Sequence, residues 1–470
     1  MPLFVADAVY LSLVYAFFIL LPPLGRDYAA LARPDSILFF GGMVQLFGGY
    51  SWAYLLLNLL LLYGCMALIL SITKEVTKGP WWLGSVAAVL FMANPVKTEA
   101  VLNISGVREL WPGFMALLTL FVYIQCRRST KRGMRGLPLL TYLVAILTGP
   151  INIMLFAVIA ILEFTVYKKR SRCWIPLALV GSAALFISGQ WAEIGALHLS
   201  CMFTPLFFVV YPIGILPDTV AFFQQWPLAG YGIAIAAVGI GIGLIRKVNH
   251  PAFTFGLLGA VAFRLCQGGF AVDPITLNGG GQLLVPIALI SIAAAGFFHA
   301  VIEKSHWRRS VVRFTTLLCI AVMCCQIWVN LHWRYAGQEV ERFQQAVVSV
   351  TKNYPGKPVA VAPDIQYYRT APMMLSESVR YTTPFSKAQP IVPLLPFSVI
   401  PPVKIVVEDY SPHAIALSVQ GLAAPEINTL PLFSRAWWLH RHDPRKAVPM
   451  CLEAEEFPFP GTLIRVYLQE

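Results

Sequence analysis

The chain has 470 residues, of which 57% are hydrophobic and only 12% are charged, and its mean hydropathy is +0.68. Soluble domains do not carry that much apolar surface, so the composition predicts a multi-pass membrane protein. The net charge of +12 would favour nucleic-acid binding in a soluble protein. Here, however, the basic residues lie mostly in short loops between apolar runs, the pattern that orients helices in a bilayer, so we expect no nucleic-acid partner.

Eleven apolar runs are predicted to cross the bilayer, because a helix needs about 20 apolar residues to span it and fewer where other helices bury it. The predicted spans are 4–21, 52–72, 81–93, 110–126, 137–148, 150–167, 174–190, 228–245, 251–267, 283–302 and 311–333. The first run lacks the basic flank and cleavage site of a signal peptide and is expected to remain as a helix. Segments 36–49 and 205–218 are interrupted by glycines or prolines and are expected to lie in the interface or to re-enter the membrane.

The basic loops predict the orientation of the spans. The strongly basic loops are 73–80, 127–136, 168–173, 246–250 and 303–310. With eleven spans these loops all fall on one side, and that side is the cytoplasm if the N-terminus is cytoplasmic. The C-terminus then lies outside the inner (plasma) membrane. The same parity puts most of the acids that lie between spans, and one histidine, on the outer face: Asp27, Glu99, Glu193, His198, Asp218 and Asp273. This gathering predicts an active cavity that opens outwards.

From residue 335 onwards the composition changes. Residues 338–354 have helical spacing, and short β-branched runs separated by prolines follow. We therefore divide the chain into a transmembrane domain, 1–334, and a soluble domain of mixed α/β type, 335–470, which the topology makes extracytoplasmic (periplasmic).

One polar stretch, 92–109, interrupts the apolar pattern. It reads MANPVKTEAVLNISGVRE and follows an Asn-Pro that closes an apolar run. Ionisable groups at the membrane boundary cost free energy, about 2.5–3.5 kcal/mol each at the bilayer centre, so they are expected to face a watery cavity or a partner. The stretch is therefore either the wall of a polar site or a short external loop whose charges meet solvent.

Several segments, taken in order, resemble the motifs of a known family. WAYLLLN, at 52–58, resembles W-G-Y-H-L-x-N, and ARP, at 32–34, resembles the Y-R-P that precedes it. NPVKTEAVLNISGVREL resembles H-P-x-H-x-E-A-V-x-x-I-x-G-R-x-x-L. Four more segments are similar to later motifs of the same family: LTGPINIMLFAVIAILEF, YPIGILPDTVAFFQQWPL, GGQLLVP and RYAGQEVERFQQAVVSVTKNYP.

Together these segments cover about residues 1 to 355 and resemble the transmembrane and TPR-containing O-mannosyltransferases and their bacterial relatives, members of the GT-C superfamily. The resemblance implies an α-helical polytopic fold of GT-C type with about 11 transmembrane helices. It also implies an enzyme that takes a sugar from a polyprenyl phosphate and passes it to a protein or envelope-glycan acceptor outside the membrane. No TPR array follows.

The resemblance implies roles for particular residues. Asp27 would be the general base, and Glu99 would position the acceptor or orient a lysine. Arg33, Lys97 and Arg108 would hold the donor phosphate. The residues expected to line the cavity or contact the acceptor are Tyr54, Asn58, Asn94, Asn103, His198 and Asp273. No metal or other cofactor is predicted, because the paired acids of the family's first loop are reduced to Asp27, although divalent-metal use stays open.

Other departures from the family fall on polar groups and spare the packing residues. The family's histidines, the arginine of G-R, the lysine of S-K and the E-R pair correspond here to Leu55, Asn94, Lys97, Val107, Gly149, Gly280 and Gly281. These losses favour an alternative: a catalytically degenerate GT-C-like scaffold, a subunit of a membrane complex, whose outer domain binds a partner protein. A transporter is a weaker third interpretation, because no predicted span carries a row of ionisable residues.

Each candidate residue also has a purely structural explanation. Asp27 could cap a helix, and Arg33 could reach lipid head groups. Lys97 and Glu99 could pair with each other, while Arg108 could simply mark the start of the next helix. The sequence leaves the enzyme and the scaffold both open.

Overall fold

The computed structural model describes the chain mainly as one bundle of apolar helices. The described residues are Tyr15, 46–47, 50–94, 97–129, 136–167, 174–187, 239, 243–265, 283–304 and 308–353, with short strand segments between 359 and 465. The predicted spans 4–21 and 228–245 lie almost entirely outside these residues, as do the predicted interfacial segments.

Most of the described helices begin and end close to the predicted runs, whereas the last one continues to Asn353, past the predicted end of its span at 333. The long or apolar helices are α4 (Ser51–Thr77), α5 (Trp82–Met92), α7 (Val107–Arg128), α8 (Leu137–Thr148), α9 (Leu155–Leu162), α10 (Trp174–Ile187), α16 (Pro251–Leu265), α17 (Leu284–Lys304) and α18 (Arg308–Asn353). Short helical elements join them: α6 (Thr98–Leu102), η3 (Ile104–Gly106), η5 (Pro150–Met154) and the π-helical turn η6 (Glu163–Tyr167). Helix α8 coincides with its predicted run.

Four of the described helices are long and apolar enough to cross a membrane, and they cover Trp52–Thr77, Ile104–Arg128, Leu284–Glu303 and Arg309–Gln338. Shorter apolar helices of 10–17 residues lie between them. The predicted class, a helical protein with transmembrane helices, is therefore supported in its general form. The count of eleven crossings stays a prediction.

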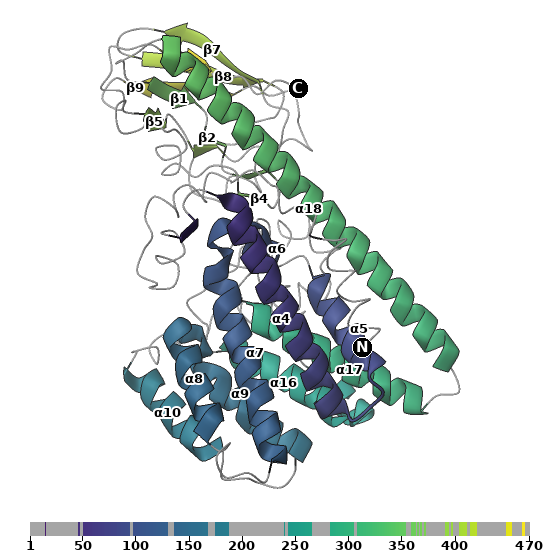
Figure 1. Ribbon diagram of the computed structural model, residues 1–470. Coiled ribbons are helices and arrows are strands. Elements are labelled where there is room, and N and C mark those ends of the chain that lie inside the picture. The colour runs from purple at the N-terminus through teal and green to yellow at the C-terminus, as the bar shows by residue number, and fades with distance from the viewer. Residues whose placement is uncertain are drawn as a thin grey trace.

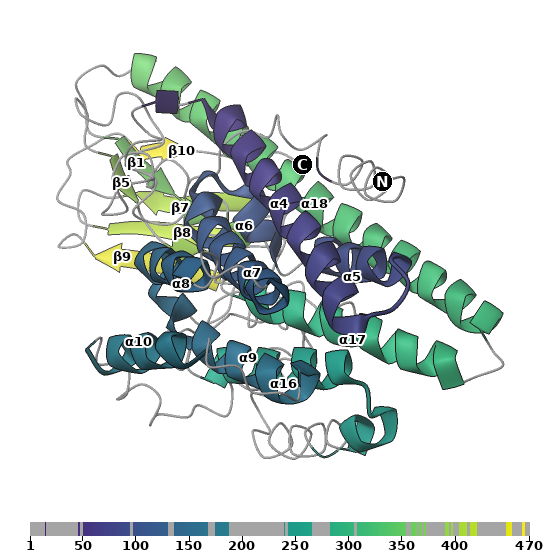
Figure 2. The same ribbon diagram turned by 60° about the horizontal axis from the view of Figure 1, so that its bottom comes forward.

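Close contacts between small residues join α16 to α17. A Cβ atom on Gly256 would lie 2.4 Å from the carbonyl oxygen of Leu289, and one on Gly296 would lie 2.6 Å from the backbone nitrogen of Phe253. Neither position tolerates a side chain, so glycine lets the two backbones approach, as is common between membrane helices. Both views show α16 and α17 side by side (Figures 1 and 2).

The described ends of the basic loops meet at one end of the bundle, here called the basic end (Lys74–Gly79, Arg127–Arg128, Glu163–Tyr167, Ile245–His250 and His299–Glu303). Arg128 forms an ion pair with Glu75, and Arg127 forms one with Glu163. His250 and His299 are joined by a 2.9 Å hydrogen bond between Nε2 and Nδ1. The opposite end, which holds α6, is called the polar end.

Helix α18 runs along one flank of the bundle, with α10 on the opposite flank, and extends to the strands of the C-terminal part (Figures 1 and 2). It continues without a break across residue 334, where the composition predicts the domain boundary. The helix contacts β3 (Tyr367–Tyr368) and β4 (Ala371–Pro372), which pair with each other.

The C-terminal strands form small sheets. The remaining strands are β1 (Val359–Ala362), β2 (Asp364–Ile365), β5 (Ile391–Pro393), β6 (Pro396–Phe397), β7 (Lys404–Tyr410), β8 (Ala414–Gln420), β9 (Val448–Glu453) and β10 (Leu463–Arg465). Strand β1 lies between β10 and β5 with parallel pairing, β2 pairs with β6, and β7, β8 and β9 form an antiparallel sheet. The soluble mixed α/β domain at 335–470 stays a prediction.

Candidate functional site

The polar stretch folds into the bundle as two short helical elements, α6 and η3, between α5 and α7. Most of its polar side chains are withdrawn from the surface: Lys97 is 0% exposed, Glu99 5% and Asn103 2%, and Arg108 and Glu109 are half-buried. They do not form a loop with its charges in solvent, as one interpretation of the sequence proposed. The stretch is instead a buried polar layer beneath the polar end.

Local chemistry explains why the chain turns here. The Oδ1 atom of Asn103 accepts hydrogen bonds from the backbone nitrogen of Ser105 at 3.0 Å and from its Oγ at 2.9 Å, which caps η3. A Cβ atom on Gly106 would lie 1.9 Å from the carbonyl oxygen of Ala100. Only glycine permits that approach, so these two residues fold η3 back against α6 before α7 begins.

Asn58 ties α4 to this turn. Its Nδ2 donates to the carbonyl oxygens of Asn103 at 2.8 Å and Val101 at 3.3 Å, and the side chain is completely buried. The last carbonyls of a helix have no partner within that helix, so Asn58 supplies a donor to the end of α6 at Val101. It adds a second donor to the Asn103 carbonyl, which also accepts from the Gly106 backbone nitrogen at 2.9 Å. Tyr54, one turn earlier, is also buried and packs edge-on against Phe47 with ring centroids 5.6 Å apart. Both were predicted to line a cavity, and in the structure both lie inside the bundle.

Lys97 points its ammonium into the protein. Nζ donates to the carbonyl oxygens of Met92 and, at 2.9 Å, of Asn94, and it lies 3.4 Å from the hydroxyl oxygen of Tyr15. It also lies 5.5 Å from the ring centroid of Phe91. Burial lowers the pKa of Lys97 well below its usual range. An ammonium has three N–H donors, and each has an oxygen acceptor here, so in this conformation Lys97 holds the α5–α6 connection together.

Glu99 and Arg108 complete the predicted set at the polar end. Glu99 lies in the first turn of α6, and Arg108 with Glu109 lies in the first turn of α7. Glu99, Arg108 and Glu109 each take part in a polar or electrostatic interaction within the protein. Arg108 does mark the start of a helix, as its structural explanation proposed, and α6 and α7 are in contact.

Four predicted site residues lie outside the described part of the chain: Asp27, Arg33, His198 and Asp273. Their positions relative to α6 therefore stay predictions. The described candidates, Tyr54, Asn58, Asn94, Lys97, Glu99, Asn103 and Arg108, all belong to elements that meet at the polar end.

Helix α18 contributes polar residues that sequence reasoning missed. Gln326 and Asn330 are 0% exposed, and Nε2 of Gln326 donates to Oγ1 of Thr98 at 2.9 Å and to Oδ1 of Asn330 at 2.6 Å. The sequence does contain a signal for this contact: two amide side chains lie four residues apart within an apolar run. Such residues share one face of a helix, which indicates a polar face turned into the bundle.

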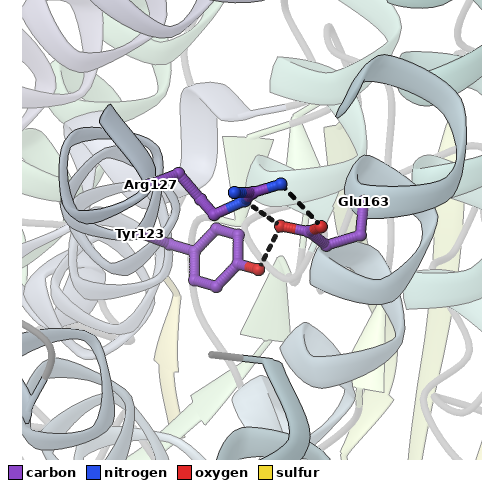
Figure 3. A network of polar contacts seen from close by, with 3 residues as sticks. All are labelled: Tyr123, Arg127 and Glu163. Atoms are coloured by element: carbon purple, nitrogen blue, oxygen red, sulfur yellow. Dashed lines mark hydrogen bonds and ion pairs between the residues drawn. The ribbon is translucent and has the colours of Figure 1, made fainter. Parts of the chain in front are cut away.

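A second buried polar network lies at the basic end (Figure 3). Glu163, in the π-helical turn, accepts a 2.5 Å hydrogen bond from the Tyr123 hydroxyl, and its two carboxylate oxygens lie 2.6 and 3.2 Å from Nε and Nη2 of Arg127. The Glu163 side chain is 1% exposed. In the sequence, the signal for this network is Glu163, an isolated acid within the apolar run 150–167. This network joins α7 to η6 and lies at the other end of α7 from Arg108.

Comparison with known proteins identifies no similar protein. The chain matches no protein-family model, no curated protein and no solved structure.

Proposed function

We propose that this chain is an integral-membrane glycosyltransferase of GT-C type whose site lies at the polar end. It takes a sugar from a polyprenyl phosphate and gives it to an extracytoplasmic protein or envelope-glycan acceptor. One observation carries the proposal: the Asn58 amide binds the backbone of Val101 and Asn103. Two stretches that resemble the family's motifs, 43–45 residues apart, therefore meet at the place where the resemblance needs a site.

The proposed orientation follows from the basic loops. Their described ends meet at the basic end, and positive loops favour the cytoplasmic side. The polar end then faces outwards. With eleven crossings, the N-terminus is cytoplasmic and 335–470 forms an extracytoplasmic domain at the inner (plasma) membrane.

In the proposed reaction, the acceptor hydroxyl oxygen attacks the anomeric carbon of the donor sugar. The bond from that carbon to the phosphate oxygen breaks, and its electron pair stays on the phosphate. The hydroxyl proton passes to the carboxylate of Asp27, and Glu99 orients the acceptor. Arg33 and Arg108 neutralise the phosphate. Lys97 fixes the connection between α5 and α6, because its donors are already bound to protein oxygens.

The alternative is a GT-C-like scaffold without catalysis, in which the outer domain binds a partner protein of an envelope complex. The geometry of Lys97 favours it, because the N–H donors of this predicted phosphate ligand are occupied by protein oxygens. The two functions differ in whether the polar end binds a lipid-linked sugar.

The test uses purified protein in lipid nanodiscs, supplied with polyprenyl-phosphate sugars and a hydroxyl acceptor. We expect native protein to bind donor and to release sugar to the acceptor. Asp27→Asn should bind donor with unchanged affinity and lose transfer by at least about 100-fold, the usual contribution of a general base. The control Glu303→Gln alters a 62% exposed acid at the basic end and should leave both unchanged. Absence of donor binding and of transfer in the native protein would contradict the enzyme and favour the scaffold.

A further inference from the structure

The inner face of α18 is polar where it meets α6. Gln326, Asn330 and Trp333 are spaced four and three residues apart, so they share one side of the helix, and their exposed fractions are 0%, 0% and 2%. The opposite side of the same helix is apolar and exposed, for example at Leu317 (65%) and Leu331 (50%). The helix therefore turns its polar residues away from lipid and into the bundle.

This inner face of α18, together with Thr98 of α6, which Gln326 contacts, is here called the α6–α18 seam (Thr98, Gln326, Asn330 and Trp333). Two polar atoms of the seam have no hydrogen-bond partner among the described residues. They are Oε1 of Gln326 and Nε1 of Trp333. The Nε2 of Gln326 already donates both of its protons, to Thr98 and Asn330. Buried polar atoms are almost always paired, because an unpaired one loses its hydration without compensation.

We propose that the α6–α18 seam binds hydroxyl groups. The Gln326 oxygen can accept a hydrogen bond and the Trp333 indole N–H can donate one, and a hydroxyl is the small neutral group that can do both. The seam residues themselves carry no formal charge, which argues against an ion as the occupant. Gln326 and Trp333 are seven residues apart, about 10 Å along a helix axis. The seam therefore holds more than one hydroxyl, either of a few water molecules or of a sugar.

The two sources of hydroxyl groups depend differently on the proposed function. A sugar in the seam rests on the proposed glycosyltransferase, since it would be the sugar of the lipid-linked donor lying beside Thr98 of α6. Water in the seam does not depend on any enzymatic activity. The experiment therefore has two arms, one that detects water and one that detects the sugar.

The first arm detects water by brief X-ray hydroxyl-radical labelling of the full-length protein in nanodiscs, read by mass spectrometry. Water held beside a buried side chain should label Trp333 several-fold faster than Phe255, which is completely buried in an apolar helix. Gln326→Met should reduce Trp333 labelling towards that of Phe255. The control Cys324→Ala, on the exposed side of α18, should not. Thr98→Val replaces Gln326→Met if the latter does not fold.

The second arm compares the affinity for polyprenyl phosphate with and without an attached sugar. If the seam holds the sugar, the sugar should tighten native binding at least several-fold, and Gln326→Met should abolish this difference while still binding the lipid phosphate. Fast Trp333 labelling without a sugar effect supports water as the occupant, whether or not the protein is an enzyme. Trp333 labelling no faster than that of Phe255, together with no sugar effect, would overturn the proposal.

Discussion

At the scale of single residues, the polar end consists of side chains that complete the hydrogen bonding of a broken helix. Asn58 and Lys97 come from different parts of the chain, yet both donate to backbone carbonyls at or just beyond helix ends. This explains how polar and ionisable residues can be buried in an apolar bundle: most of their donors are used by the backbone. A residue of this kind shapes the site without touching a substrate.

Replacing Asn58 tests this role directly. Asn58→Leu keeps the approximate volume but removes the side-chain donor to the carbonyls of Val101 and Asn103. Among the described residues, the Asn103 carbonyl then keeps only the hydrogen bond from the Gly106 backbone nitrogen. We expect a loss of about 1–3 kcal/mol in unfolding free energy, measured by reversible denaturation in mixed micelles. Leu60→Ala, at a site in the same helix that is 57% exposed, should change stability much less. Equal losses in the two variants would show that Asn58 does not hold the turn.

Lys97 should make stability depend on pH. Burial lowers its pKa in the folded state below the ordinary value of 10.5, so the unfolded chain binds the proton more tightly. Unfolding free energy should therefore rise with pH between the folded pKa and about 10.5, and fall as pH decreases through that window. Lys97→Met should remove this part of the pH dependence, as measured by unfolding at several pH values. Parallel pH profiles for the two proteins would contradict the prediction.

At the scale of elements, the bundle depends on a few close contacts between helices. Helices α16 and α17 meet through Gly256 and Gly296, whose missing side chains let the backbones touch. At the basic end, a buried carboxylate at a π-helical turn binds an arginine and a tyrosine of α7. Each contact joins helices that the sequence alone could not pair.

The glycine contact provides a matched pair of variants on one helix. A Cβ atom on Gly256 would lie 2.4 Å from the Leu289 carbonyl oxygen, whereas one on Gly259 would make ordinary contacts of 3.4–3.7 Å. Gly256→Ala should therefore destabilise the protein by about 1–3 kcal/mol through overpacking. Gly259→Ala should be neutral or stabilising by up to about 1 kcal/mol, because alanine favours helix. The midpoints of thermal unfolding of the two variants test this prediction. Equal midpoints would show that the close contact at Gly256 does not limit side-chain size.

The network in Figure 3 predicts a cost for removing one charge. Glu163→Gln leaves Arg127, whose side chain is only 19% exposed, without its carboxylate. We expect about 1.5–3 kcal/mol of destabilisation, the usual value for hydrogen bonds to charged groups. Glu303→Gln breaks only an exposed contact with His299 and should cost less than about 1 kcal/mol. Similar unfolding curves for Glu163→Gln and native protein would show that the network adds no stability.

At the scale of the whole molecule, the apolar runs predicted where the helices lie, because membrane helices are recognised by composition and length. The run 137–148 matches α8, and 251–267 matches α16 within two residues. The sequence did not predict where Lys97 points, since its acceptors are carbonyls that become available only once α5 ends. Nor did it predict the contact of Gln326 with Thr98, which joins residues 228 positions apart. Pairing over that distance depends on how helices pack, which periodicity does not encode.

The central claim is that the polar end receives a lipid-linked sugar. The most direct measurement is photo-crosslinking with a polyprenyl-phosphate sugar that carries a photoreactive group beside the phosphate, followed by peptide mapping of the native protein in nanodiscs. We predict saturable crosslinks to the stretch 97–109, competed by unlabelled donor and reduced at least several-fold in Arg108→Gln. Crosslinks confined to the basic end, or labelling that unlabelled donor does not compete, would contradict the claim.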